Sequence, residues 1–379
     1  MEDKFSLKSK VFFNKQSLKY LTQIKGSCAF VVSDSIMETL GYLQQTIDYL
    51  KEAGISSTPF TGVRPDPDIK IIEEGLKAYL NSKADVLVAI GGGSAIDTAK
   101  AILFFAQKYE NEAGIKKVKP VFVAIPSTSG TGSEVTDFSV ITYGGEKICI
   151  VDEFISPDIA ILDSTCIQHV PQRVVVDTGI DVLVHAIEAY VSIKATDFTD
   201  ALAEKSIKLI FENLETLNKD IKDPDARDRV QNASCMAGMA FTNTGLGINH
   251  SLAHAFGANF HISHGRSNAL MLSAVMEYNA DISGSANNYA AERYAKLASA
   301  LNLPARTSRE GSVNLITAVN RLKKTLGIED SISALNIDKT EFDSALSKMA
   351  NTAMLDRCTP TNPRQPTSDD LIQIYKKCY

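Results

Sequence analysis

Short runs of β-branched and other apolar residues alternate with helix-like segments from the start of the chain to about residue 173. Runs of this kind, spaced widely enough for crossover helices, are typical of a parallel sheet covered by helices on its faces. We therefore predict an α/β domain with a parallel, nucleotide-binding type of sheet over residues 1–173. The predicted strands are AFVVS (29–33), ADVLVAI (84–90), VFVAI (121–125) and IAIL (159–162).

The pattern changes beyond residue 174, where proline becomes rare and apolar residues recur with a helical period. Two examples are DFTDALAEKSIKLIFENLETL (197–217) and NNYAAERYAKLASAL (287–301). Near the end, a proline-rich turn leads into a capped helix that is expected to begin at Thr367 or Ser368. We predict an all-helical domain over residues 174–379.

The length and composition favour a protein of two domains without a nucleic-acid partner. With 379 residues, of which 44% are hydrophobic, the chain exceeds the usual size of one domain. The net charge of −6 is spread along the chain without a basic stripe, which argues against a nucleic-acid partner. The first residues lack a signal-peptide pattern, and no apolar run approaches the roughly 20 residues that span a bilayer. The six cysteines include no C-x-x-C pair, as expected of reduced thiols in a cytoplasmic protein.

A glycine turn, Gly91–Ser94, follows the predicted strand 84–90 directly and leads into the helical pattern AIDTAKAILFFA. A strand, a glycine turn and a helix in succession present free backbone N–H groups and a positive helix dipole, which suit a pyrophosphate. Ile96 stands where the G-x-G-x-x-G fingerprint has its third glycine, so this is not the usual Rossmann signature. A purely structural turn would explain the glycines equally well.

A second loop, Ser127–Ser133, follows the predicted strand 121–125 and is rich in hydroxyl groups. Two such loops at the ends of two parallel strands would meet in one crevice, which favours a nucleotide ligand. The strand 29–33 leads into Asp34, whose carboxylate could bind ribose hydroxyls and repel a 2′-phosphate, so NAD is expected rather than NADP. The alternative role for Asp34 is a helix N-cap.

Asp181, His185 and Glu188 are spaced i, i+4, i+7, which predicts one polar stripe on an otherwise apolar helix. A buried carboxylate and a buried imidazole are costly unless something pairs with them. A simple Asp–His ion pair would satisfy that requirement, and so would a metal ion.

A histidine cluster favours the metal, because four of the six histidines in the chain fall between residues 250 and 264. They are His250, His254, His261 and His264. Neutral imidazoles with one carboxylate suit Fe²⁺ or Zn²⁺. Helical spacing would group the first three on one face, so spacing alone leaves open which histidines bind.

Four long motifs resemble those of the iron-dependent (group III) alcohol dehydrogenase family. They are GGGSAIDTAK, IPSTSGTGSEVT, TGIDVLVHAIEAYVS and GINHSLAHAFGANFHISHG. The similarity extends from the first predicted strand to the C-terminal TNPR segment and implies the two-domain fold shared with dehydroquinate synthase. Within the family, DFTDALAEK and NASCMAGMAF are similar to segments of propanol dehydrogenases from propanediol-utilisation microcompartments, which implies association with such a compartment.

The resemblance also implies roles for individual residues. It puts the metal ligands at Asp181, His185, His250 and His264. His254 matches a histidine that faces the nicotinamide and the substrate without binding metal, whereas His261 matches no functional position. The family's NAD contacts fall on Asp34, Gly92, Gly93, Ser94, Asp97, Thr128, Thr131, Val140 and Lys147.

The activity that the resemblance implies is hydride transfer between NAD(H) and a small alcohol or aldehyde at iron or another divalent ion. Phe138 stands where a member acting on hydroxylated aldehydes has a polar residue, and with Phe241 it would form an apolar substrate pocket. A short primary alcohol or unsubstituted aldehyde, such as propanal, would fit this pocket better than a diol. The family usually forms dimers or larger oligomers, so self-association is expected.

Related scaffolds perform other chemistry. A zinc polyol dehydrogenase with a glycerol- or propanediol-type substrate is the closest alternative. A dehydroquinate-synthase-like lyase would need several basic residues to hold a substrate phosphate, and only Arg266 lies beside a predicted ligand in the sequence. A third alternative is a non-catalytic member of the family that acts as an assembly partner. The complete set of predicted metal ligands argues against it, because such a protein would not need them.

Overall fold

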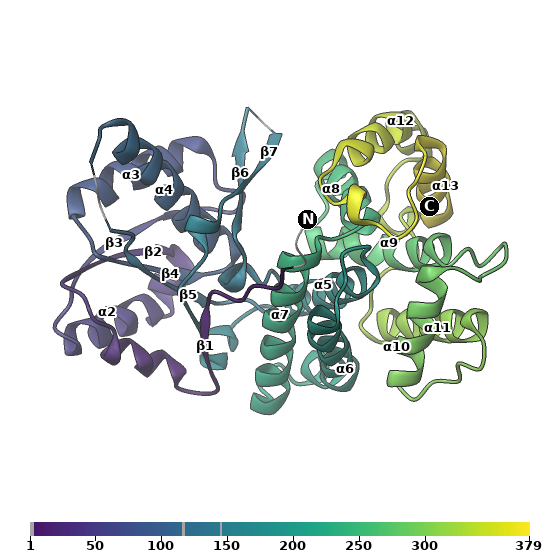
Figure 1. Ribbon diagram of the computed structural model, residues 1–379, viewed down its shortest axis with the longest axis horizontal. Helices are drawn as coiled ribbons and strands as arrows, with labels where there is room; N and C mark the ends of the chain where they lie inside the picture. The colour runs from purple at the N-terminus through teal and green to yellow at the C-terminus, as the bar shows by residue number, and fades with distance from the viewer. Residues whose placement is uncertain (1–3, 116–117, 145) are drawn as a thin grey trace. The chain divides into compact units, whose positions relative to one another are not determined.

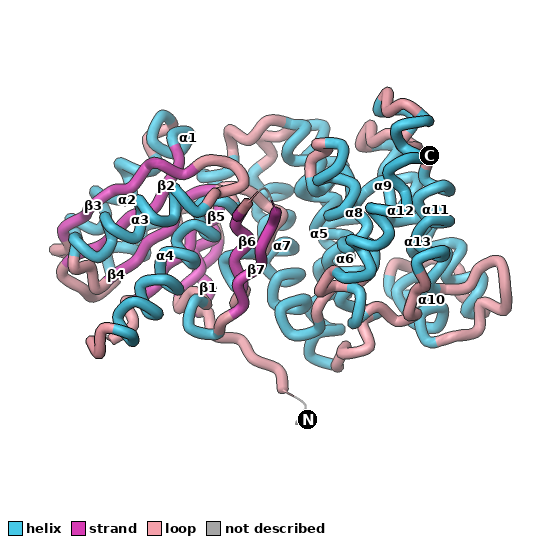
Figure 2. The backbone as a smooth tube through the Cα atoms, turned by 90° about the horizontal axis from the view of Figure 1, so that it is seen from above, coloured by secondary structure: helices cyan, strands magenta, loops and turns pink. Residues whose placement is uncertain are grey.

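The computed structural model describes residues 4–115, 118–144 and 146–379 (Figure 1). The chain divides into two compact units, Ser6–Val170 and Pro171–Tyr379, and the second also includes residues 4 and 5. The change from one unit to the other thus falls at residues 170/171, against the predicted 173/174. All strands of the described chain lie in the first unit, and the second is built from helices (Figure 2).

The first unit contains a sheet of six described strands, all parallel, in the order β1-β8-β5-β4-β2-β3. The predicted parallel α/β architecture is therefore confirmed, and the four predicted strands correspond to β2, β4, β5 and β8. The bounds are β1 (Lys10–Phe13), β2 (Cys28–Asp34), β3 (Ser56–Val63), β4 (Val86–Gly91), β5 (Val121–Pro126) and β8 (Ile159–Leu162).

Within this sheet, the two strands that were not predicted from the sequence are β1 and β3, and they form its two edges. Strand β3 contains Pro59 and Gly62, which the edge of a sheet tolerates because one side of the strand needs no ladder hydrogen bonds. Strand β1 is four residues long and leaves Phe13 55% exposed. Neither segment has the continuous apolar run that marks a buried parallel strand.

Helices cover both faces of the sheet. They are α1 (Ser35–Thr39), α2 (Tyr42–Glu52), α3 (Ile69–Ser82) and α4 (Gly93–Glu112). Successive residues of a strand point to opposite faces, so Val88 of β4 packs in the cluster with α2, whereas Leu87 packs in the cluster with α3 and α4. An antiparallel pair, β6 (Phe138–Tyr143) and β7 (Glu146–Val151), lies beside α4.

The second unit consists of α5 (Gln172–Val191), α6 (Asp197–Lys219), α7 (Pro224–Thr244), α8 (Ile248–Phe260), α9 (His264–Asn279), α10 (Tyr289–Ala300), α11 (Ser308–Thr325), α12 (Lys339–Leu355) and α13 (Ser368–Cys378). Helix α5 is its centre: from Ile180 to Val191 every residue is buried, and it packs against α6, α7 and α9. The predicted C-terminal helix is α13, which Thr367 caps in a capping box. Among the described residues, no helix combines the length and the apolar character needed to cross a bilayer.

The central row of the sheet generates a stability prediction. Phe122 is fully buried in β5, next to Leu87 of β4 in the strand register. Phe122→Ala should lower the free energy of opening of β4 and β5 by about 3–5 kcal/mol, because it leaves a cavity in a packed face. Native-state hydrogen exchange of the strand amides measures this change. Phe13→Ala, at the exposed edge, is the matched control, and an equally small effect for both variants would contradict the prediction.

Candidate metal and nucleotide sites

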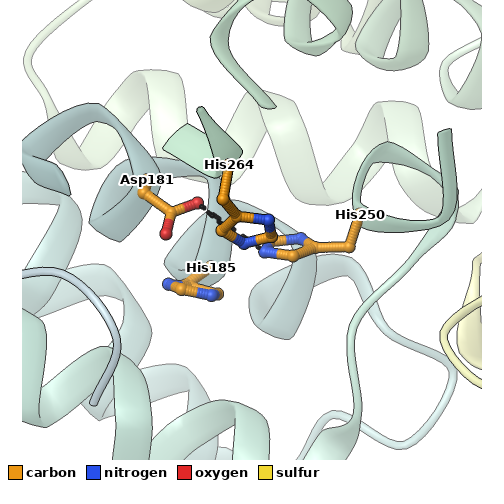
Figure 3. Close-up of side chains that lie close together, drawn as sticks. All are labelled: Asp181, His185, His250 and His264. Atoms are coloured by element: carbon orange, nitrogen blue, oxygen red, sulfur yellow. Dashed lines mark ion pairs between the residues drawn. The ribbon is translucent and has the colours of Figure 1, made fainter. Parts of the chain in front are cut away.

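Four side chains from three helices of the second unit converge, as Figure 3 shows. Asp181 and His185 lie on α5, His250 on α8, and His264 is the first residue of α9. Each offers one potential ligand atom, and these atoms lie within 4.8 Å of one another. Oδ1 of Asp181 is 3.8 Å from Nε2 of His250 and 3.6 Å from Nε2 of His264. The ring of His185 stacks on that of His250, with centroids 4.6 Å apart.

The end of α8 explains why His264, and not His261, joins this group. Helix α8 ends at Phe260, and His261 forms its C-cap with a left-handed φ of 56°. Helical spacing therefore stops before His261, which is exposed. The short turn that follows carries the chain into α9 and brings His264 to the other ligands.

Glu188 fixes the orientation of His250. Its Oε2 forms a very short hydrogen bond with Nδ1 of His250, and its Oε1 accepts a 2.7 Å hydrogen bond from the backbone N–H of Asn249. Because Nδ1 is engaged, Nε2 of His250 is the atom that faces the group. From the sequence we predicted Glu188 on the same helix face as Asp181 and His185, but we predicted no function for it. Its i+7 spacing from Asp181 was the signal that pointed to a role in this group.

Asn268 of α9 connects two of the ligand side chains. Its Nδ2 donates a 2.7 Å hydrogen bond to Oδ1 of Asp181 and lies 3.1 Å from Nε2 of His264. Asn249 holds this amide in place through a 2.9 Å hydrogen bond to its Oδ1. No spacing in the sequence indicated Asn268, because its role depends on how α9 packs against α5.

The electrostatics of the group fit a divalent cation. Burial raises the pKa of Asp181, so an isolated carboxylate is disfavoured there. Burial and the nearby charges of His264 and His254 lower the pKa of His250 well below its usual value, which keeps the imidazole neutral as a ligand must be. Among the described residues, Nε2 of His250 is buried without a hydrogen-bond partner. Three imidazoles and a carboxylate suit Fe²⁺ or Zn²⁺.

His254 lies one turn after His250 on α8 and stacks on His264, with ring centroids 5.2 Å apart. Its Nδ1 is 2.8 Å from Oδ2 of Asp356, whose Oδ1 accepts a hydrogen bond from the backbone N–H of Cys358. Although burial acts in the opposite direction, the hydrogen bond and charge of His254 hold the pKa of Asp356 well below its usual range. Asp356 was not predicted from the sequence.

Phe241, one of the two predicted pocket residues, stands directly against the ligand group. It lies on α7, is 3% exposed, and stacks on His185 with ring centroids 4.5 Å apart. Its ring gives the group an apolar wall. Phe138, the other predicted pocket residue, begins β6 in the first unit.

Six of the residues predicted to bind a nucleotide lie at or after the carboxyl ends of β2, β4 and β5, which are neighbours in the sheet. They are Asp34, Gly92, Gly93, Ser94, Thr128 and Thr131. The order in which strands are added to the sheet changes direction here: β3 lies on one side of β2, and the next strand, β4, lies on its other side. Such a switch point is where open α/β sheets bind ligands. The two predicted loops therefore belong to adjacent strands, as expected.

Asp34 fills one of its two predicted roles directly. Its Oδ1 accepts hydrogen bonds from the backbone N–H groups of Ile36 and Met37 and so caps α1. The other oxygen, Oδ2, lies beside Gly91, and a Cβ at Gly91 would approach it to 2.8 Å. Gly91 also has a φ of +153°, which a side chain would disfavour.

The glycine turn Gly91–Ser94 and the hydroxyl-rich loop Ser127–Ser133 lie close together. Gly92 is the N-cap of α4 and offers no side-chain cap, so backbone N–H groups remain at this helix start. A Cβ at Gly93 would meet the Thr131 methyl group at 2.8 Å, and one at Gly92 would lie 3.7 Å from that of Thr128. The backbone at Gly93 therefore has no room for a side chain, and Ser94 follows as a half-buried residue of the first turn.

The remaining predicted cofactor residues make contacts within the protein. The Asp97 carboxylate accepts hydrogen bonds from Oγ of Ser133 at 2.8 Å and from the backbone N–H of Val140 at 3.2 Å. Nζ of Lys147 lies 2.7 Å from Oδ1 of Asp66, and both side chains are more than half exposed.

Glu188 provides a test of the metal centre. Glu188→Gln keeps the shape of the side chain but replaces the carboxyl group that binds Nδ1 of His250, and such outer partners typically contribute 10–100-fold to metal affinity. We expect a loss of that order in a competition titration between the protein and a chelator. Glu204→Gln, on the surface of α6 and paired with Lys208, is the control. Unchanged metal affinity in Glu188→Gln would refute the assigned role.

Comparison with known proteins gives matches along almost the whole chain. The family described as iron-containing alcohol dehydrogenase matches residues 8–164, and the C-terminal part of the Fe-containing alcohol dehydrogenase family matches residues 175–379. A solved iron-containing alcohol dehydrogenase from Thermococcus thioreducens has a TM-score of 0.91 and 36% identity, with 99% of both chains covered.

Curated relatives agree with these matches. The 1-propanol dehydrogenase PduQ of Citrobacter freundii is 37% identical over 98% of this chain and 99% of its own length. The NADPH-dependent butanol dehydrogenase of Clostridium saccharobutylicum is 38% identical over 99% of this chain and 98% of its own length. An aldehyde-alcohol dehydrogenase of Streptococcus pneumoniae is 39% identical over 98% of this chain, which spans only 45% of that longer relative. The chain belongs to the iron-containing alcohol dehydrogenase family.

Proposed function

We propose that this protein is a metal-dependent, NAD(H)-linked dehydrogenase that interconverts short-chain primary alcohols and aldehydes. The observation that carries the proposal is the convergence of Asp181, His185, His250 and His264. Among the described residues, the buried Nε2 of His250 has no hydrogen-bond partner. When bound, a divalent cation would supply Lewis acidity toward an alcohol or carbonyl oxygen, and NAD would supply the hydride acceptor.

The side chains around the ligand group have separate tasks in this proposal. Glu188 orients His250, and Asn268 orients Asp181. His254 holds or transfers the substrate proton at Nε2, because its Nδ1 is engaged by Asp356. Phe241 excludes water from the face of His185. An apolar wall of this kind supports a short unsubstituted alcohol or aldehyde, and Phe138 of the first unit stays a predicted pocket residue.

In the first unit, Asp34, Gly92, Gly93, Ser94, Thr128 and Thr131 are proposed to contact the dinucleotide, with Asp97, Val140 and Lys147 completing the site. Oδ2 of Asp34 supports NAD over NADP, because a carboxylate there repels a 2′-phosphate. One relative is named NADPH-dependent; the preference proposed for this chain rests on its own Asp34.

The environment of Arg266 disfavours a lyase that holds a substrate phosphate. Arg266 is 4% exposed, its Nε donates to Asp177 at 2.8 Å, and its Nη1 donates to Glu329 at 2.6 Å. Two carboxylates thus neutralise the guanidinium that a phosphate would require. A polyol dehydrogenase remains the second candidate, and a panel of propanal, glycerol and propanediol would separate the two.

His264 is the ligand whose removal tests the reaction most directly. His264→Ala should reduce the turnover of propanal with NADH on the order of a hundredfold or more, since even outer partners of a ligand cost 10–100-fold. Steady-state rates with anaerobically added Fe²⁺ or Zn²⁺ measure the loss. His261→Asn is the matched control, because asparagine tolerates the left-handed conformation of that residue. Near-normal turnover of His264→Ala in excess metal would sink the proposal.

Asp34 allows the cofactor preference to be separated from stability. Asp34→Asn keeps an effective N-cap but removes the charge, so the ratio of kcat/KM for NADPH to that for NADH should rise about tenfold or more. The melting temperature should stay close to that of the wild type. Asp68→Asn, which alters the N-cap of α3, is the control. An unchanged cofactor ratio in Asp34→Asn would show that this carboxylate does not select the cofactor.

A further inference from the structure

Lys100 is a fully buried cation in the first unit. It lies on α4, is 0% exposed, and has an ammonium group surrounded by oxygen atoms. Nζ donates to the backbone oxygen of Ser133 at 2.6 Å, to Oγ of Ser133 at 3.1 Å, to Oγ1 of Thr136 at 2.9 Å and to the backbone oxygen of Phe138 at 2.9 Å. Burial lowers the pKa of Lys100 to about 8, while the neighbouring acids Asp97 and Glu134 act in the opposite direction.

All of these acceptors belong to one short stretch of chain, Ser133–Phe138. This stretch forms the end of the loop between β5 and β6, which we call the β5–β6 loop (residues 127–137), and the first residue of β6. The carboxyl group of Asp97, one turn before Lys100 on α4, accepts hydrogen bonds from Oγ of Ser133, within this stretch, and from the backbone N–H of Val140, two residues beyond it. Helix α4 therefore holds this end of the loop through two side chains, the Lys100 ammonium and the Asp97 carboxyl group.

The other end of the loop carries the hydroxyl residues proposed to bind the dinucleotide. Thr131 lies so close to Gly93 that a Cβ there would meet its methyl group at 2.8 Å, and Thr128 lies next to Gly92. The spacing between these two loops thus depends on where the β5–β6 loop is held. Lys100 is about 9 Å further along α4 than Ser94, at 1.5 Å per residue, too far to contact a phosphate at the helix start.

We propose that Lys100 is a positioning residue for the dinucleotide site: its buried ammonium holds the β5–β6 loop against α4, so that the threonine hydroxyls and the start of α4 face one ligand. The inference rests on the proposed function, since it takes NAD(H) as that ligand. Lys100 acts through the loop and touches neither the cofactor nor the metal ligands.

The test compares Lys100→Met with Lys119→Met. Methionine retains much of the side-chain volume but donates no hydrogen bond, so the buried oxygens of the loop lose their donor. Lys119, two residues before the start of β5, is a matched lysine of the same unit. Its Nζ donates to the backbone oxygen of Ser156 and to Oδ1 of Asp158. We expect the NADH Kd of Lys100→Met, measured by NADH fluorescence with metal-loaded protein, to rise on the order of tenfold to a hundredfold. Lys119→Met should stay within about twofold of the wild type.

Kinetics and hydrogen exchange distinguish positioning from a general loss of structure. In Lys100→Met the KM for NADH should rise much more than kcat for propanal falls, and amides of the β5–β6 loop should exchange faster while those of α5 do not. A folded Lys100→Met with wild-type NADH Kd would overturn the proposal. If Lys100→Met does not fold, Thr136→Val decides instead, because it removes one acceptor of Lys100 with little change of volume. A raised NADH Kd with faster loop exchange supports the proposal, and unchanged values reject it.

Failure of the proposed function can be told apart from failure of the proposal for Lys100. If the wild type binds neither NADH nor NADPH, the proposed dehydrogenase function fails, and the dinucleotide role of Lys100 fails with it. Loop exchange in Thr136→Val then still determines whether Lys100 orders the β5–β6 loop.

Discussion

The requirement to compensate a buried carboxylate shapes the second unit. Asp181 lies on a helix whose surroundings are apolar, and its side chain is 4% exposed. Burying such a group without partners is expensive, and here three imidazoles and the Asn268 amide surround it. Close backbone packing makes this possible: a Cβ at Gly265 would come within 1.9 Å of the Asp177 backbone oxygen, so α9 must approach α5 with only a glycine between them. His264 reaches Asp181 because of that approach.

The parts of the fold that could be predicted are those in which burial leaves a continuous pattern. Strands β2, β4, β5 and β8 are the inner strands of the sheet and are mostly buried. Because inner strands of a parallel sheet are covered on both faces, their sequences are continuous apolar runs. Edge strands need no such run, so β1 and β3, with its internal proline, escaped prediction, as did the antiparallel pair β6–β7. The helices of the second unit were predicted from the helical period of their apolar residues and from capping residues, such as Thr367 at the start of α13.

The candidate site was predictable as a set of residue types, less so as a geometry. Spacing grouped Asp181 with His185, but it could not decide between His261 and His264, since that depends on where α8 ends. Glu188 was visible on the stripe without a role, and Asn268 and Asp356 left no local signal because tertiary packing alone brings them to the histidines. Asp97 was predicted to contact the cofactor, and its hydrogen bonds to Ser133 and Val140 could not be foreseen, because only the tertiary fold brings those residues to it.

The wide separation of the ligands along the chain has a consequence for how the protein matures. Asp181 and Asn268, which share a hydrogen bond, are 87 positions apart, and α5, α8 and α9 must all be packed before the group exists. Contacts between distant segments form late because closing long loops costs entropy. A cation would therefore bind to the finished helical unit and stabilise it by mass action, with no influence on the early steps of folding. Metal added during refolding should then leave the early folding steps unchanged and slow only the unfolding of the packed helical unit.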